Sequence, residues 1–324
     1  SSDPLWRGEI YKHDKIRVGY VSADFRQHAV ACLIAGVFEC HNKSNFEITA
    51  ISIGPDDRSE MRQRLEKTFD RFIDARALRE DEIARLIREA EIDILIDLNG
   101  FTENARVGVF AFRPAPIQVN FLGYPGTMGS SYIDYIIGDP IIIPASYQNC
   151  YAEKIICLPH SYQANDTKRQ ISEKVFTRAE CGLPDGKFVF CCFNNAYKIL
   201  PDTFDRWMRV LRQVEGSVLW LLEANATATA NIKKETITRG VNAERIVFAK
   251  RAPPPEHLAR HRLADLFLDT LPYNAHTTAS DALWMGLPVL TQIGETFAGR
   301  VAASLLNAIG LPELIAKTQD EYER

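Results

Sequence analysis

The chain has 324 residues, of which 46% are hydrophobic and 25% charged, and its formal net charge is −4. These values are typical of a soluble globular protein, and the length predicts two domains of about 150 residues each. A weakly acidic chain is not expected to be built chiefly for binding nucleic acid. No apolar run approaches the roughly 18 residues of a membrane span, and the first ten residues do not form a signal-peptide core.

The seven cysteines are scattered along the chain and form no CxxC pair. Neither a disulfide framework nor a zinc site is therefore expected. A reducing cytoplasm is the simplest compartment for such a chain.

In the first half of the chain, apolar runs alternate with amphipathic segments. The expected strands lie in KIRVGYVSA, FEITAISIG, IDILIDLNG, PIQVNFLGYPG, YIDYIIGDP and EKIICLP, and the expected helices at 29–40, 81–90 and 104–113. Near-continuous apolar strands such as IDILIDL suit a parallel sheet that is buried on both faces. A polar stretch at 163–173 follows and is the best candidate for an interdomain linker.

The second half repeats this alternation. Strands are expected in KFVFCCFN, SVLWLLEA, ERIVFAK, LADLFLDT and PVLTQIG, and helices at 202–214, at 298–309, in a segment ending near Gly240 and in a final run at 313–324. Strands that alternate with helices of this length indicate βαβ units and parallel sheets. We therefore predict an α/β protein with two Rossmann-like lobes, 1–165 and 166–324, that face each other across a cleft. Ligands of such sheets bind at the carboxyl ends of the strands.

Two strand-to-helix junctions of the second lobe are suited to binding an anion. Lys198 follows CCFNNAY and precedes a helix opened by Pro201, while His276, Thr277 and Thr278 open another helix. Free N–H groups and the positive end of a helix dipole attract phosphate, so a nucleotide diphosphate is the expected ligand. The alternative interpretation is structural: Lys198 would be a solvated surface lysine, and the threonines would be ordinary helix caps.

Three further side chains allow both a functional and a structural interpretation. Asp281, in the first turn of the second helix, either complements the dipole or binds a ribose. His257 lies in a loop expected to be stiffened by three prolines, where it could stack on a base or lie on a surface helix. Its spacing to His261 resembles a metal pair, but no third ligand accompanies it. His28 follows the first strand and is either a proton-transfer group or a helix cap.

At this point the motifs resemble the catalytic region of the O-linked N-acetylglucosamine (O-GlcNAc) transferases. The resemblance rests on SADFRQHAV, LNGFTENAR, RPAPIQVNFLGYPGTMG, YIDYIIGD, LPHSY, CCFNNAYKI, SVLWLLEA, HTTASDALWMGLPVLT and GETFAGRVAASLL, in this order over nearly the whole chain. The chain is similar to bacterial members, without the long insert that animal members carry between the lobes.

The resemblance implies a GT-B glycosyltransferase that moves N-acetylglucosamine from UDP-GlcNAc to Ser or Thr hydroxyls of intracellular proteins, inverts the anomeric centre and needs no metal or other cofactor. The first lobe would face the acceptor and the second would bind the UDP-sugar. Tetratricopeptide repeats usually precede this region in the family, and we expect them upstream in the full-length protein.

The resemblance also implies roles for individual residues. Lys198 would neutralise the diphosphate, and His28 would approach the acceptor hydroxyl, although the general base stays open. The donor would be bordered by Asn195, Pro159, His160, Ala252, His257 (on uracil), His276, Thr277 and Thr278 (on phosphate), Asp281 (on ribose), and Gly123, Tyr124, Pro125 and Gly126 (near the sugar).

Two positions depart from the family pattern. Pro254 stands where the uridine loop often carries a lysine, and Asn195 stands where a glutamine is usual. Both bear on the identity of the donor. A UDP-glucose-dependent transferase, a UDP-GlcNAc 2-epimerase of the same fold and a non-catalytic UDP-sugar-binding module therefore remain as alternatives.

Overall fold

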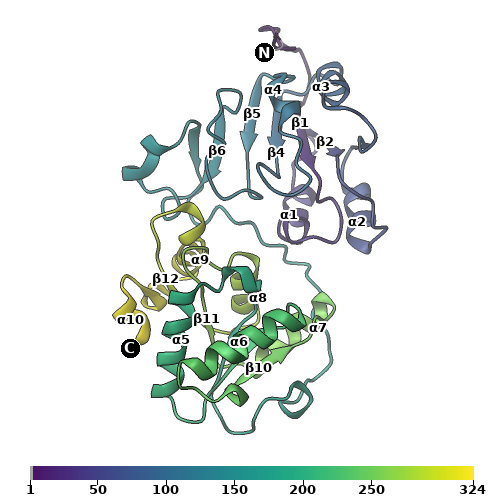
Figure 1. Ribbon diagram of the computed structural model, residues 1–324. Helices are drawn as coiled ribbons and strands as arrows, with labels where there is room; N and C mark the ends of the chain where they lie inside the picture. The colour runs from purple at the N-terminus through teal and green to yellow at the C-terminus, as the bar shows by residue number, and fades with distance from the viewer. Residues whose placement is uncertain (1–2) are drawn as a thin grey trace. The chain divides into compact units, whose positions relative to one another are not determined.

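The computed structural model describes residues 3–324, and the chain divides into two compact units after Lys168. The sequence placed the boundary after residue 165. Both positions lie in the polar stretch 163–173 that was expected to link the domains. Each unit is an α/β layer structure built on one parallel sheet (Figure 1), which confirms the predicted pair of parallel-sheet lobes.

The first unit is built on a seven-stranded sheet. Its strands are β1 (Ile16–Ser22), β2 (Phe46–Ser52), β3 (Arg71–Asp74), β4 (Ile94–Asp97), β5 (Ile117–Asn120), β6 (Tyr135–Gly138) and β7 (Lys154–Cys157), in the order β3-β2-β1-β4-β5-β6-β7. Every neighbouring pair is parallel. The order reverses between β1 and β4, which makes the ends of these two strands the topological switch point.

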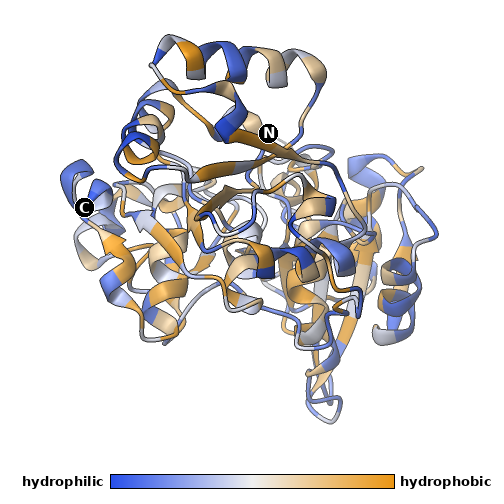
Figure 2. Ribbon diagram, turned by 90° about the horizontal axis from the view of Figure 1, so that it is seen from below, coloured by the Kyte–Doolittle hydropathy of each residue, from blue (hydrophilic) through white to orange (hydrophobic). Residues whose placement is uncertain are grey.

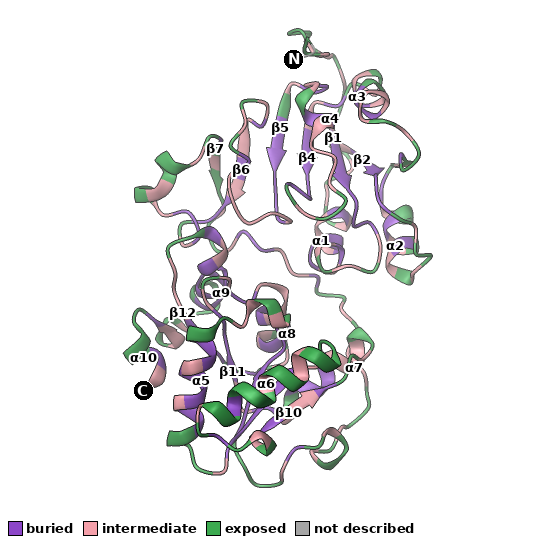
Figure 3. Ribbon diagram, in the orientation of Figure 1, coloured by how far each residue is buried: buried purple, intermediate pink, exposed green. Residues whose placement is uncertain are grey.

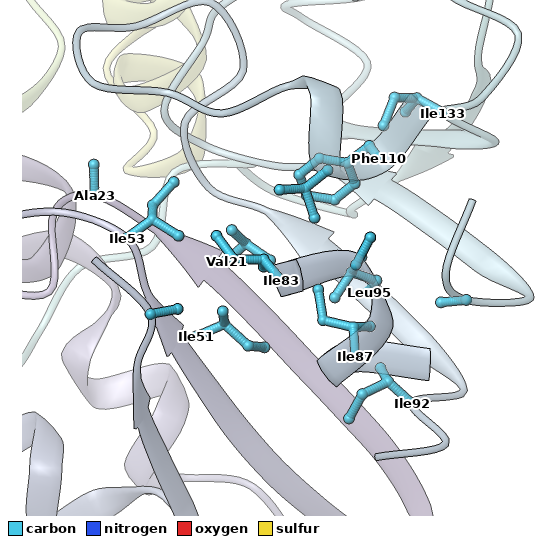
Figure 4. Close-up of a cluster of buried hydrophobic side chains, with 14 of the residues drawn as sticks. Val21, Ala23, Ile51, Ile53, Ile83, Ile87, Ile92, Leu95, Phe110 and Ile133 are labelled. Atoms are coloured by element: carbon cyan, nitrogen blue, oxygen red, sulfur yellow. The ribbon is translucent and has the colours of Figure 1, made fainter. Parts of the chain in front are cut away.

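The helices of this unit are α1 (Ala29–Glu39), α2 (Glu60–Thr68), α3 (Glu80–Glu89) and α4 (Gly108–Ala111). One core cluster lies between the sheet and α3 and α4 (Figure 4). There Val21 and Ile51 of the first two strands meet Ile83, Ile87 and Leu95, all five buried. Burying a side chain of this kind contributes about 1.5–3 kcal/mol, which offsets the entropy lost on ordering the chain.

The second unit repeats the same strand order with six strands. They are β8 (Val189–Cys192), β9 (Val218–Leu222), β10 (Ile246–Ala249), β11 (Leu266–Leu268), β12 (Val289–Gln292) and β13 (Ile315–Ala316), in the order β10-β9-β8-β11-β12-β13. All neighbours are again parallel. The switch point therefore lies between β8 and β11.

Its helices are α5 (Pro201–Gln213), α6 (Ala226–Thr238), α7 (Pro254–Arg260), α8 (Thr277–Trp284), α9 (Val301–Ala308) and α10 (Gln319–Glu323). The strands are drawn largely in the hydrophobic colour, whereas the helices mix both colours (Figure 2). Helix α6 is mostly exposed, with Thr236 as its buried residue (Figure 3). None of the helices in residues 3–324 is long and apolar enough to span a bilayer.

Three expected elements differ from the structure. The helix expected at 104–113 is reduced to Gly108–Ala111, because Asn104 and Arg113 have positive φ angles of 62° and 46°, a conformation that no right-handed helix contains. The helical run expected at 313–324 was wrong over its first part, where Ile315–Ala316 pairs with β12. The expected loop around His257 is helix α7, in which Pro254 and Pro255 occupy the first turn, where proline is tolerated.

Candidate active site

The loops that follow β8 and β11 meet at the switch point of the second unit. Lys198 ends the one-turn helix η3 (Ala196–Lys198), just before α5, and His276 is the N-cap of α8. Because β8 and β11 are neighbours in the sheet, the fold brings together two of the sequence motifs that lie about eighty residues apart. The structure thus groups the predicted phosphate-binding residues where doubly wound sheets bind their ligands.

The Lys198 ammonium is partly buried between this loop and an aromatic ring. Its Nζ donates to the carbonyl oxygen of Asn274 at 2.8 Å and lies 4.0 Å from the centroid of the Tyr273 ring. Burial lowers the pKa of Lys198 to about 8, opposed by the negative charge of Asp269. At neutral pH the ammonium is therefore still mostly charged, and its desolvation strengthens its attraction for an anion.

His276 packs against the same ring. Its imidazole stacks on Tyr273 with centroids 4.8 Å apart, and its Nε2 lies 3.1 Å from the carbonyl oxygen of Ala298. A carbonyl only accepts, so we assign the proton to Nε2. Burial and the nearby Lys198 lower the pKa of His276 to about 3. The ring is consequently neutral, and Tyr273 holds it and Lys198 in a fixed relation.

The two threonines begin helix α8. The first N–H groups of a helix have no partner within it and point toward an incoming anion. The Thr278 hydroxyl donates to the side-chain oxygen of Asn194, whose amide nitrogen donates to the Thr270 hydroxyl at 2.8 Å. Thr277 is the first residue of the helix. The helix start is thus tied to the ends of both β8 and β11.

Asp281 is buried in the second turn of α8 and forms an ion pair with Arg169. Burial raises the pKa of Asp281, and the neighbouring Arg169 opposes that rise. The guanidinium donates to Oδ1 of Asp281, and Oδ2 is the oxygen that we assign to another donor. The expected ribose contact stays a prediction, to be made in competition with Arg169.

His257 lies on α7, behind the end of β8. Its ring packs against Phe193 and His261, with centroids 5.2 and 4.8 Å away. Burial, together with the neighbouring His261 and Arg260, lowers the pKa of His257 to about 2. A neutral imidazole among aromatic rings is suited to stacking on a flat ligand. Ala252 lies in the loop that precedes α7 and is partly exposed.

Asn195 is exposed, whereas its neighbour Asn194 is buried and joins the network at the helix start. Sequence reasoning selected the exposed amide and missed the buried one. It also missed Arg169, Asp269 and Tyr273. For Asp269 a signal exists, since a carboxylate that ends the apolar run LADLFLD is placed at the carboxyl end of a strand.

In the first unit, His28 is the N-cap of α1 and follows the end of β1. Its Nδ1 accepts from the backbone N–H of Val30 at 3.3 Å and lies 3.5 Å from Oδ1 of Asp24. Burial lowers the pKa of His28, opposed by Asp24 and Glu103. While Nδ1 accepts from Val30, the proton of the neutral ring is on Nε2. A proton taken up on Nδ1 would face the Asp24 carboxylate and replace the bond to Val30.

The loops after β1, β4 and β5 are joined around this histidine. The Asn99 side chain donates to Asp24 Oδ2 at 2.8 Å and accepts from the Ala23 N–H at 2.7 Å. A Cβ on Gly123 would lie 1.9 Å from the carbonyl oxygen of Leu98, so only glycine allows this approach. The turn Gly123–Gly126 is thereby held beside the end of β4.

Within that turn, Tyr124 packs edge-to-face on Phe101, with ring centroids 5.3 Å apart. Pro125 and Gly126 are partly exposed. Pro159 and His160 follow β7 and are exposed. Strands β5 and β6 separate β7 from β4, so the sheet of this unit does not bring these two residues to the switch point that holds His28.

Comparison with known proteins agrees with this architecture. The model of glycosyl transferase family 41 matches residues 6–174 and 167–324. A solved structure of an O-GlcNAc transferase mutant from Thermobaculum terrenum superposes with a TM-score of 0.89 at 33% identity, covering 96% of this chain and 59% of that one.

Two curated relatives are similar over almost the whole chain. A probable UDP-N-acetylglucosamine–peptide N-acetylglucosaminyltransferase (SEC) of Arabidopsis thaliana is 40% identical over 315 residues, which cover 95% of this chain and 32% of the plant protein. A UDP-N-acetylglucosamine–peptide N-acetylglucosaminyltransferase of Caenorhabditis elegans is 30% identical over 428 residues, covering 98% of this chain and 37% of that protein. That alignment is longer than this chain, in keeping with an insert that this chain lacks.

The two Rossmann-type sheets define a glycosyltransferase of the GT-B fold. The chain belongs to glycosyl transferase family 41. It spans about a third of the length of the curated relatives it matches.

Proposed function

We propose that this chain is the catalytic region of a protein O-GlcNAc transferase. It would move N-acetylglucosamine from UDP-N-acetylglucosamine to serine and threonine hydroxyls of an acceptor protein. The names of the two curated relatives support this donor and this kind of acceptor. The proposal extends to upstream tetratricopeptide repeats and to a cytoplasmic location.

The observation that carries the proposal is the position of Lys198. Its partly buried ammonium lies at the switch point of the second unit, on the same Tyr273 ring as the N-cap residue of α8. A UDP-sugar carries two negative charges on its diphosphate, and the departing UDP gains one more. A preorganised cation and a helix start can stabilise that charge, an effect worth about 3–4 kcal/mol for each well-placed donor.

The proposed reaction is a single displacement that inverts the anomeric carbon. The acceptor oxygen forms a bond to C1 of the sugar while the bond from C1 to the diphosphate oxygen breaks. The hydroxyl proton passes to a base, and the electron pair of the broken bond stays on UDP. Because Lys198 and α8 would offset the developing charge, the proposal needs no metal ion.

His28 is the candidate for the acceptor side. Its pKa is held below the ordinary value, so its neutral form is available to receive a proton at and below neutral pH. Asp24, fixed by Asn99, would stabilise the imidazolium that forms. The turn Gly123–Gly126 would lie near the sugar, and Pro159 and His160 would border the donor.

Residues of the second unit would make the remaining contacts with the UDP-sugar. His257 would stack on uracil beside the backbone near Ala252, and Thr277 and Thr278 would bind phosphate. Asp281 would accept a ribose hydroxyl at Oδ2. Asn195 would border the sugar nucleotide from the loop after β8.

The experiment incubates the chain with UDP-GlcNAc and a library of serine- and threonine-containing peptides in EDTA, and identifies the products by mass spectrometry and NMR. The proposal predicts β-linked GlcNAc on a hydroxyl with release of UDP. Conversion of the donor without an acceptor would indicate an epimerase, and transfer from UDP-glucose alone would overturn the donor assignment.

A further inference from the structure

A buried carboxylate closes the loop that faces Lys198. Asp269 follows β11 and is 3% exposed. Its Oδ1 accepts from the backbone N–H groups of Thr270 at 2.7 Å and Ala275 at 2.6 Å, and its Oδ2 accepts from the Thr291 hydroxyl at 2.6 Å. Three charge-assisted hydrogen bonds thus fix both ends of the segment 270–275 and tie it to β12.

This segment presents the groups that hold the lysine. Asn274 is anchored through its side chain, which donates to the carbonyl oxygen of Thr270 at 2.8 Å, and its own carbonyl oxygen accepts from Lys198 at 2.8 Å. Tyr273, one residue earlier, supplies the ring beside the ammonium. The position of the ammonium therefore depends on the conformation that Asp269 imposes on the loop.

The charges around these groups are few. Among residues 3–324, the titratable groups that interact electrostatically with Lys198 are Asp269, the Cys192 thiol on β8 and His276. Asp269 in turn faces Lys198, the Cys192 thiol and the Tyr322 hydroxyl of α10, which donates to its backbone carbonyl at 3.0 Å.

Of these groups, only the carboxylate can supply a negative charge near neutral pH. Burial raises the pKa of both Cys192 and Tyr322, and His276 is neutral because its pKa is about 3. Burial likewise raises the pKa of Asp269, to about 6, so above that value its charge opposes the loss of the proton from Lys198.

We propose that Asp269 is a positioning residue for Lys198: its carboxylate fixes the loop that binds the ammonium and supplies the charge that keeps this lysine protonated for phosphate binding. The inference rests on the proposed function, because it assigns a role in binding the UDP diphosphate. Asp269 itself would not touch the ligand.

An amide in place of the Asp269 carboxylate separates its two contributions, which are the hydrogen bonds that fix the loop and the negative charge near Lys198. Asparagine can accept from both backbone N–H groups through its oxygen and donate to the Thr291 hydroxyl through its nitrogen. The loop would keep its three hydrogen bonds, while the charge would be lost. Asp269→Asn therefore tests the electrostatic part of the proposal in a folded protein.

Asp97 offers a matched control in the first unit. It ends β4, is 2% exposed, and its Oδ1 accepts from the N–H groups of Asn99 and Gly100 at 2.9 and 3.0 Å. Asp97→Asn is thus the same exchange at an equally buried strand end, but without Lys198.

The experiment measures the Kd for UDP by calorimetry between pH 6 and 8.5 for the unmodified chain, Asp269→Asn and Asp97→Asn. Lys198 of Asp269→Asn should lose its proton at lower pH. Because the protonated lysine is the form that attracts phosphate, a fall of about one unit in its pKa weakens UDP binding most at high pH. The Kd of Asp269→Asn divided by the Kd of the unmodified chain should then rise from below about twofold at pH 6 to about five- to tenfold at pH 8.5. Titration of the UDP phosphate itself cancels in the ratio.

Two controls should show a Kd ratio that does not change with pH. One is Asp97→Asn with UDP. The other is Asp269→Asn with uridine in place of UDP, because uridine has no phosphate.

A ratio for Asp269→Asn that is constant with pH would reduce the residue to a structural role and overturn the proposal. So would a pH-dependent ratio that persists with uridine. If the unmodified, folded chain does not bind UDP at any pH, the proposed function fails, which is a different outcome from failure of this inference.

Discussion

The Asp281 carboxylate is paired with the guanidinium of Arg169, and the two side chains are only 10% and 11% exposed. Arg169 is the first residue of the second unit and comes from the polar stretch that leads into it. The carboxylate expected to bind ribose is therefore already neutralised by a residue about 110 positions earlier in the chain. This pair fastens the beginning of the unit to its predicted nucleotide site.

Replacing Arg169 with methionine should leave a buried carboxylate without its partner. We expect Arg169→Met to lower the free energy of unfolding by on the order of 3 kcal/mol, measured by urea denaturation at pH 7. The matched control is Arg76→Met, because Arg76 pairs with Asp74 where both side chains are more than 40% exposed, and there the loss should be much smaller because water screens the pair. Equal losses in both variants would show that the buried pair does not stabilise the unit.

Lys198→Ala should abolish transfer while the chain stays folded. Loss of the ammonium removes one well-placed stabiliser of the leaving group, so we expect transfer to fall by at least about 100-fold. Circular dichroism and thermal unfolding report on the fold. Lys233→Ala, on the exposed face of α6, is the control and should retain full activity. Substantial transfer by Lys198→Ala would contradict its role.

His28→Ala should separate turnover from nucleotide binding. If the imidazole accepts the acceptor proton, kcat should fall by about 100-fold or more, while the Kd for UDP stays within about twofold. Because burial lowers the pKa of His28, kcat of the unmodified chain should rise with pH and level off with a midpoint below 6.5. Weakened UDP binding with normal kcat would instead place His28 on the nucleotide.

The stability of the second unit should fall on mild acidification. Burial lowers the pKa of His261 to about 4, against about 6.5 in an unfolded chain. Between these values the unfolded state binds a proton that the folded state does not, so the free energy of unfolding falls as the pH falls, by up to about 1.4 kcal/mol per pH unit.

His261→Gln should make that dependence shallower by about the same slope, measured by urea denaturation from pH 7 to pH 5. An identical slope in His261→Gln would show that this histidine does not contribute to the acid sensitivity of the fold.

Much of the fold could be predicted because the strands are apolar runs bounded by turns. Buried parallel strands such as Val189–Cys192 have a pattern of their own, and the polar residues after them mark the carboxyl ends of the strands. The order of the strands in the sheet could not be predicted directly from the sequence. It explains why Lys198 and His276 meet, because β8 and β11 pair side by side in the sheet.

The failures have local and long-range causes. The short strand Ile315–Ala316 was read as helix because a two-residue strand has no period and depends wholly on its pairing with β12. Asn104 and Arg113 adopt positive φ angles that their residue types do not demand. The partnership of Arg169 with Asp281 joins distant positions, and no local pattern encodes such a contact.

Nucleotide binding by Lys198 and α8 is tested most directly by calorimetric titration of the folded chain with UDP, UDP-GlcNAc and UDP-glucose in the presence of EDTA. We expect UDP to bind with a micromolar Kd without a divalent cation, and UDP-GlcNAc to bind more tightly than UDP-glucose. Failure of the folded chain to bind UDP until a divalent cation is restored would contradict charge stabilisation by Lys198 and α8. A preference for UDP-glucose would contradict the assigned donor.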